Sequence, residues 1–166
     1  MRTHTLLVGA HMSVAGGLAC AIEQAVACGF NCVQLFTHSP RVWDAPAPSP
    51  DDCARFCAAR RAHGLRFVMV HAPYLPNPAS PDDRLWRTSI DVIRRDLNTS
   101  DALEADAYVI HPGSTKGGRP GSGIQRVRDA LLRVCDGGVP RAQFLLETTS
   151  GAGSMLGVGD VGSRFA

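Results

Sequence analysis

Four side chains that can bind a metal ion stand at the ends of short apolar runs. His11, His71 and His111 each follow such a run, and Glu147 closes the run Phe144–Leu146. Two imidazoles and one carboxylate form a donor set that suits zinc and leave a fourth coordination position for water. Bound zinc lowers the pKa of that water to about 7. His71, His111 and Glu147 fit this set, with Glu147 as the candidate catalytic residue.

The alternative for each histidine is a structural role. A lone histidine at a strand end is more often a hydrogen-bonded structural residue than a metal ligand. Three histidines at equivalent positions reverse that expectation. An ionised carboxylate buried without a partner costs several kcal/mol, and Glu147 ends an apolar run. We therefore expect Glu147 to have a partner or a metal ion.

The runs that precede these residues alternate with helical patterns. Strands are predicted at Leu6–Ala10, Cys32–Phe36, Arg66–Val70, Tyr108–Ile110 and Phe144–Leu146, and helices at Leu18–Cys28, Asp51–His63, Asp82–Glu104 and Ile124–Cys135. Short, two-sided apolar strands joined by amphipathic helices indicate an α/β protein with a parallel sheet. The carboxyl ends of parallel strands in a barrel converge on one face, so the four candidate residues are expected to meet there.

The spacing of strands and helices does not separate an open doubly wound sheet from a (β/α) barrel. The segment Gly9–Gly17 lacks the G-x-G-x-x-G frame, so no dinucleotide cofactor is expected. The alternation stops after the fifth strand, whereas an eight-fold barrel takes about 250 residues. We interpret residues 1–157 as the N-terminal portion of a barrel and residues 158–166 as an atypical Gly-rich tail.

Composition excludes several classes of protein. The 166 residues are 45% hydrophobic and 19% charged, which excludes a disordered or fibrous chain. Apolar runs fall far short of the roughly 20 residues of a membrane span, so a soluble, cytoplasmic protein is expected. A net charge of +2 is too small to indicate a nucleic-acid partner through bulk charge. The six cysteines form no C-x-x-C pair, and we expect reduced packing residues.

Five short motifs occur along the chain in a fixed order. They are G-A-H-M-S at 9–13, F-T-H-S-P-R-V-W at 36–43, V-H-A-P-Y-L-P-N at 70–77, H-P-G-S at 111–114 and E-T-T-S-G-A-G at 147–153. Together they resemble endonuclease IV, the zinc-dependent apurinic/apyrimidinic endonuclease of base excision repair. The matches cover nearly the whole chain, from about residue 9 to 157. The resemblance implies a TIM (β/α)8-type barrel of the xylose isomerase-like kind, with about five βα units present here.

The resemblance also assigns a role to each candidate ligand. It implies that His71, His111 and Glu147 hold the first zinc of a three-zinc cluster and that Glu147 bridges to the second. His11 would lie near this cluster. The family draws its other zinc ligands from the C-terminal half of the barrel, and the chain ends before them. We therefore expect the protein ligand set for one zinc ion only, and feeble cleavage or none by the chain itself.

Three further residues match the DNA-facing side of the family. They are Arg41 and Trp43, on the loop after the second strand, and Tyr74, which stands between prolines. The structural alternatives are a solvated cation for Arg41, a loop anchor for Trp43 and a turn residue for Tyr74. The implied partner is double-stranded DNA with abasic sites.

The implied activity is hydrolysis of the DNA phosphodiester 5′ to an abasic sugar, which leaves a 3′-hydroxyl. Two alternatives stay open. One is a sugar isomerase or epimerase of the xylose isomerase-like barrels, which use histidine and glutamate with a divalent metal. The other is a non-catalytic fragment that keeps the fold signature.

Overall fold

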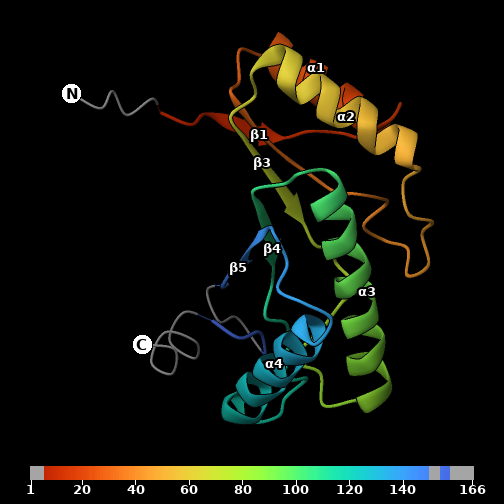
Figure 1. The fold of residues 1–166 in the computed structure, drawn as a ribbon. Helices are drawn as coiled ribbons and strands as arrows, with labels where there is room; N and C mark the ends of the chain where they lie inside the picture. The colour runs from red at the N-terminus through yellow and green to blue at the C-terminus, as the bar shows by residue number, and fades with distance from the viewer. Residues whose placement is uncertain (1–5, 150–153, 158–166) are drawn as a thin grey trace.

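The computed structural model describes residues 6–149 and 154–157, and there strands and helices alternate without exception (Figure 1). The elements are β1 (Gly9–His11), α1 (Leu18–Ala27), β2 (Cys32–Leu35), α2 (Pro50–His63), β3 (Phe67–His71), α3 (Asp83–Ala102), β4 (Ala107–Ile110), α4 (Pro120–Cys135) and β5 (Gln143–Leu146). Every strand and helix predicted above is present, with shifts at the ends. The tail predicted at 158–166 lies outside the described residues.

The five strands form one parallel sheet in sequential order, β1-β2-β3-β4-β5. The helices lie to one side of it (Figure 1). Each right-handed crossover leads to the next strand along the sheet, so every connecting helix packs on the same face. A doubly wound sheet instead reverses its strand order at a switch point and carries helices on both faces. The structure therefore confirms the α/β class and favours the barrel over the open sheet.

The two faces of the sheet differ in burial. On β3, Val68 and Val70 are fully buried beneath the helices, whereas Phe67 and Met69 on the opposite face are partly exposed. The sequence predicts strands buried on both faces. In the described residues the helices cover only one face, so the second face, which would line a barrel interior, stays partly open.

Helix α2 shows why the local sequence predicts its ends well. Pro50 occupies the first turn, where its missing N–H costs nothing, and the Ser49 hydroxyl accepts a hydrogen bond from the Asp52 backbone N–H at 3.1 Å. Gly64 ends the helix in the left-handed conformation with φ of 63°, which a residue with a side chain adopts at a cost. The predicted start and stop signals of this helix are confirmed.

Strand β1 differs from its prediction. The apolar run at Leu6–Ala10 predicts a strand there, but the ladder begins at Gly9 and includes His11. The side chain of Asn31 accepts from the Val8 N–H and donates to the Leu6 carbonyl, both at 2.8 Å. These backbone groups are therefore satisfied by a side chain and not by a neighbouring strand, and the prediction for residues 6–8 is wrong.

Candidate metal centre

The register of the sheet places the four candidate residues on one face. His71 is paired with Val109, and Val109 is paired with Leu145. Side chains two residues apart on a strand share a face, so His111 and Glu147 project on the same side as His71. His11 reaches that face through its pairing with Gln34 on β2. This is the face that the helices leave open.

His71, His111 and Glu147 converge at the carboxyl ends of β3, β4 and β5. One ligand atom from each lies within 4.8 Å of the others. His71 Nε2 is 3.0 Å from Glu147 Oε2, and the two imidazole rings stand 5.3 Å apart between centroids. Ligands of a tetrahedral zinc ion, at about 2.0 Å from the metal, lie roughly 3.3 Å from one another. The three residues would therefore serve as protein ligands of one zinc ion.

Backbone carbonyls orient both imidazoles. His71 Nδ1 donates to the Ala72 carbonyl at 2.7 Å, and His111 Nδ1 donates to the Glu147 carbonyl at 3.0 Å. A neutral histidine that donates from Nδ1 presents Nε2 as its lone-pair atom. The carbonyl bond at Nδ1 thus directs Nε2 of each ring away from its own loop, as such bonds do for ligating histidines elsewhere, and His71 Nε2 meets Glu147 Oε2. The donor chemistry fits zinc.

The exposure of Glu147 differs from the sequence expectation. Its side chain is 52% exposed, whereas that of His71 is 7% exposed. The argument that burial alone forces a partner on Glu147 is therefore wrong, because solvent reaches the carboxylate at this open face of the sheet. It nevertheless has a partner in the ring of His71, whose Nε2 lies 3.0 Å from Glu147 Oε2.

His11 lies beside this group without joining it. Its ring centroid is 6.4 Å from that of His71 and 4.4 Å from that of Phe36. The Gln34 amide is 3.0 Å from His11 Nδ1. Partial burial, and then the charge of His71, lower the pKa of His11 below its ordinary value of 6.5.

Phe36 and Asn77 also shape the site, and the sequence motifs contain both without indicating their roles. The Phe36 ring packs edge-on against His71 and Tyr74, at centroid distances of 5.6 and 5.4 Å. Phe36 lies two residues after Gln34, which is paired with His11, so strand parity was the available signal. Nothing in the sequence alone indicates the contacts of Asn77.

Asn77 joins the loops that follow β3 and β4. Its side-chain amide donates to the Ser114 carbonyl and accepts from the Ser114 N–H, both at 2.9 Å. Asn77 is 8% exposed, and its own N–H donates to the Ser89 hydroxyl. A Cβ on Gly113, whose φ is +92°, would lie 2.1 Å from Asn77 Oδ1. Because these loops begin at His71 and His111, Asn77 fixes the two imidazoles relative to each other.

Of the residues predicted to face DNA, Tyr74 lies beside this site. Arg41 is exposed, Trp43 is half-buried, and Tyr74 is 63% exposed while its ring edge contacts Phe36. The Tyr74 backbone N–H donates to the Pro40 carbonyl at 3.1 Å, which joins its loop to that of Arg41. The structure therefore brings an exposed aromatic ring close to the metal ligands and links it to the segment that carries the cation.

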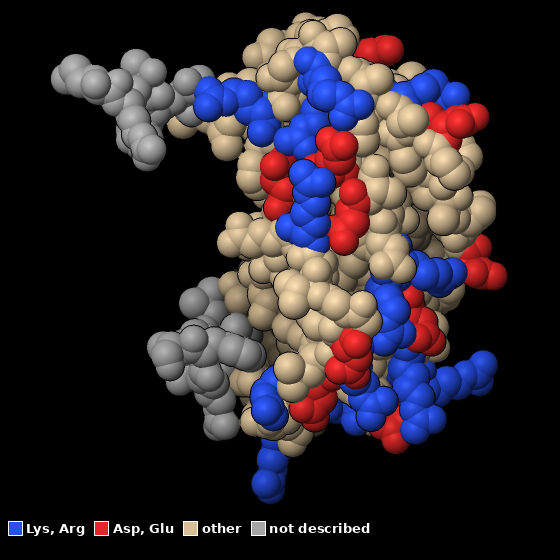
Figure 2. Space-filling model, in the orientation of Figure 1, with Lys and Arg blue, Asp and Glu red and all other residues tan. Residues whose placement is uncertain are grey.

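Acidic and basic side chains are mixed on one face of the molecule. The face seen in Figure 2 carries basic and acidic side chains next to one another, without a large patch of one sign. Ion pairs such as Arg61–Glu104 and Arg126–Asp83 account for several of them. A nucleic-acid interface on this chain must therefore rest on a few local residues, as the net charge indicates.

The remaining sequence expectations concern the cysteines and the membrane. All six cysteines are unpaired, and Cys53 and Cys57 pack in the core beneath α2. Burial raises the pKa of both of these thiols. Among the described residues, every helix is too short or too polar to cross a membrane.

Comparison with known proteins adds a family and several relatives. The family model described as xylose isomerase-like TIM barrel matches residues 22–163. A probable endonuclease 4 of Nitratidesulfovibrio vulgaris (strain DP4) is 40% identical over 156 residues, which are 92% of this chain and 54% of that protein. The chain spans about half the length of the curated relatives that it matches.

Solved structures agree with this match. The crystal structure of endonuclease IV from Thermus thermophilus superposes with a TM-score of 0.79 at 35% identity, over 91% of this chain and 55% of that one. A D-tagatose 3-epimerase-like protein superposes with a TM-score of 0.68 at 18% identity, over 91% of this chain and 57% of that one. The second likeness shows the fold alone and does not favour a sugar substrate.

Proposed function

Because the chain belongs to the xylose isomerase-like TIM barrel family, and its relatives include proteins named probable endonuclease 4, we propose that its site serves zinc-dependent hydrolysis of DNA. The bond cleaved is the phosphodiester 5′ to an abasic sugar in double-stranded DNA. The proposal includes base excision repair as the process and the cytoplasm as the compartment, both of which the family implies.

The observation that carries the proposal is the convergence of His71, His111 and Glu147. Their ligand atoms approach within 4.8 Å across three separate strands, and backbone carbonyls orient both imidazoles through Nδ1. A bound zinc ion supplies Lewis-acid chemistry, which polarises a phosphate oxygen and lowers the pKa of water. The exposed carboxylate of Glu147 faces solvent, where a substrate phosphate can approach.

The side chains around the site supply the contacts that a damaged duplex requires. Arg41 offers a guanidinium that can pair with a backbone phosphate. Tyr74 and Trp43 offer aromatic faces, and a flipped or missing base exposes stacking surface that such rings can cover. His11 lies at the edge of the site, with its ring centroid 6.4 Å from that of His71.

The experiment that tests the proposal compares two duplexes. We expect the zinc-loaded chain to bind a fluorescein-labelled duplex with one tetrahydrofuran abasic analogue more tightly than the same duplex without it. Equal affinity for the two duplexes, together with no cleavage at the 5′ side of the analogue, would contradict the proposal.

The predicted rate of cleavage is low. Within residues 6–149 and 154–157, His71, His111 and Glu147 form the one group of three or more side chains suited to a metal ion. One metal ion leaves the charge on the departing oxygen unsupported, and a second ion supplies several kcal/mol there. We therefore expect turnover at least about 100-fold below that of the Thermus thermophilus enzyme, measured on the tetrahydrofuran duplex in excess zinc.

Two variants test which residues produce this residual activity. Glu147→Gln should abolish it, whereas Glu23→Gln, on the exposed side of α1, should leave it unchanged. Turnover at a rate comparable to the Thermus thermophilus enzyme would show that one zinc ion suffices or that further ligands exist.

A further inference from the structure

A carboxylate with a role outside the metal centre is buried in the middle of α3. The Asp96 side chain is 3% exposed. Asp96 Oδ1 accepts hydrogen bonds from the Thr37 hydroxyl at 3.0 Å and from His38 Nε2 at 3.1 Å, while Oδ2 accepts from the buried Tyr108 hydroxyl at 3.3 Å. A buried carboxylate without such donors is strongly unfavourable. Asp96 therefore connects α3 to the segments that contain the three hydrogen-bond donors.

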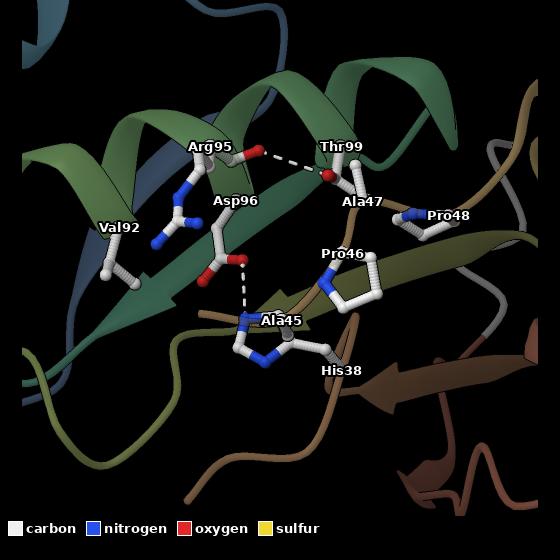
Figure 3. Close-up of a pocket in the computed structure, with 9 residues that line it drawn as sticks. All are labelled: His38, Ala45, Pro46, Ala47, Pro48, Val92, Arg95, Asp96 and Thr99. Atoms are coloured by element: carbon white, nitrogen blue, oxygen red, sulfur yellow. Dashed lines mark hydrogen bonds and ion pairs between the residues drawn. The ribbon is translucent and has the colours of Figure 1, made fainter. Parts of the chain in front are cut away.

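Two of the three donors belong to residues 37–48, which we call the rim segment. It follows β2 and contains Arg41 and Trp43. The neighbouring residue on α3, Arg95, holds the segment a second time by donating to the Trp43 carbonyl at 2.7 Å and to Asp44 Oδ1 at 2.9 Å. Figure 3 shows the Asp96 carboxylate and the His38 ring pointing toward each other, with Arg95 and Pro46 beside them.

The contacts of His38 require its protonated form. Nε2 faces the Asp96 carboxylate, and Nδ1 faces the Ser39 carbonyl at 2.9 Å. Both partners accept hydrogen bonds only, and a neutral imidazole has a single N–H to donate. Both bonds therefore form together only when His38 is an imidazolium ion.

The charges around His38 support this state. The hydrogen bond to Asp96 raises the pKa of His38 above its ordinary value of 6.5, against an opposing effect of burial and a smaller one from Arg95. Asp44 is paired with Arg95, and Asp52 at the start of α2 lines a pocket together with His38. Tyr108 on β4 also faces Asp96, and it is neutral because burial raises the pKa of its hydroxyl well above the ordinary value of 10.

We propose that Asp96 is a positioning residue and that its proton-dependent pair with His38 fixes the rim segment in the arrangement that presents Arg41 and Trp43. The part of this inference that concerns DNA rests on the proposed function; the attachment of the segment does not. The attachment is fully present below the ordinary pKa of histidine and weakens as the pH rises through the higher pKa of folded His38.

The attachment is measured by limited proteolysis of the full chain. Arg41 is the one lysine or arginine in the rim segment, so trypsin reports on local release of the segment through the Arg41–Val42 bond. The initial cleavage rate, followed by mass spectrometry, is divided by the rate for a free peptide of residues 37–48 at the same pH. This ratio removes the pH dependence of trypsin itself.

We expect the normalised rate for the unmodified chain to rise at least about fivefold between about pH 6 and pH 8.5, as His38 loses its proton. Asp96→Asn and His38→Gln should cleave about tenfold faster at the lower pH, with no rise at the higher pH, because each lacks the charged hydrogen bond. Asp91→Asn removes an exposed carboxylate of α3 that pairs with Arg94, and it should behave like the unmodified chain.

Two results would overturn the inference. One is a rate for Asp96→Asn and His38→Gln equal to that of the unmodified chain, and the other is the same pH-dependent rise in His38→Gln. Unchanged zinc binding in every variant shows that the fold is intact. If Asp96→Asn does not fold, the His38→Gln result alone decides. Gln can still donate a neutral hydrogen bond to Asp96, so this variant keeps the buried carboxylate partnered and removes only the charge.

Binding to the tetrahydrofuran duplex is the second arm of the test. Asp96→Asn should bind it at least about fivefold more weakly at about pH 6 than Asp91→Asn does, through loss of the oriented Arg41 contact. No binding by any variant, with the proteolysis result as expected, refutes the proposed function and leaves the attachment established. Equal binding by all variants refutes the role of Asp96 in presenting the segment to DNA.

Discussion

Replacing His111 by alanine is expected to lower the zinc affinity of the chain at least about 100-fold. The ring supplies one of three ligand atoms at the convergence of β3, β4 and β5, and its Nδ1 bond to the Glu147 carbonyl also orients the backbone that carries the third ligand. His111→Ala therefore removes one ligand and leaves the backbone of a second ligand, Glu147, less well oriented. Competition against a zinc-binding dye measures the effect.

The matched control is His63→Ala. His63 is exposed in the last turn of α2 and takes no part in the metal centre. Its removal should leave zinc affinity unchanged, and circular dichroism should show the same helix content in both variants. Equal zinc affinity for His111→Ala and the unmodified chain would place the zinc ion elsewhere, most directly on the cysteines.

Replacing Asn77 by aspartate is expected to weaken both folding and zinc binding. The new carboxylate would still accept from the Ser114 N–H, but it cannot donate to the Ser114 carbonyl and would place a buried negative charge against that carbonyl. We expect the free energy of unfolding to fall by on the order of 3 kcal/mol. Zinc affinity should fall about 10-fold or more, as for other residues that orient metal ligands.

Denaturation with urea, with and without zinc, measures both quantities. Asn98→Asp is the control, since Asn98 is an exposed residue of α3, and it should change neither by more than about 0.5 kcal/mol. Equal stability and zinc affinity in the two variants would mean that Asn77 does not fix the loops that begin at His71 and His111.

The order and kind of the elements were predictable from the sequence because each is specified locally. Pro50, the early aspartates and Gly64 delimit α2 as predicted, and the barrel class and the resemblance to endonuclease IV are both confirmed. The start of β1 was not predictable, since it depends on a side chain, Asn31, from beyond the next helix. Local propensity carries no information about such a contact.

Part of the candidate site was predictable for a geometric reason. Ligand-type residues at the ends of parallel strands converge whenever the strands are neighbours, so the meeting of His71, His111 and Glu147 needs only strand order and parity. The supporting contacts do not follow from such rules. Asn77 and Asp96 act through loops and a helix whose relative placement only the packed structure provides.

The measurement that tests the metal centre most directly is X-ray absorption spectroscopy of the chain loaded with one equivalent of zinc. The account predicts two imidazole nitrogens and oxygen ligands at about 2.0–2.1 Å, with no sulfur in the coordination sphere. A scatterer at about 2.3 Å, the zinc–sulfur distance, would assign the ion to cysteine and contradict the account.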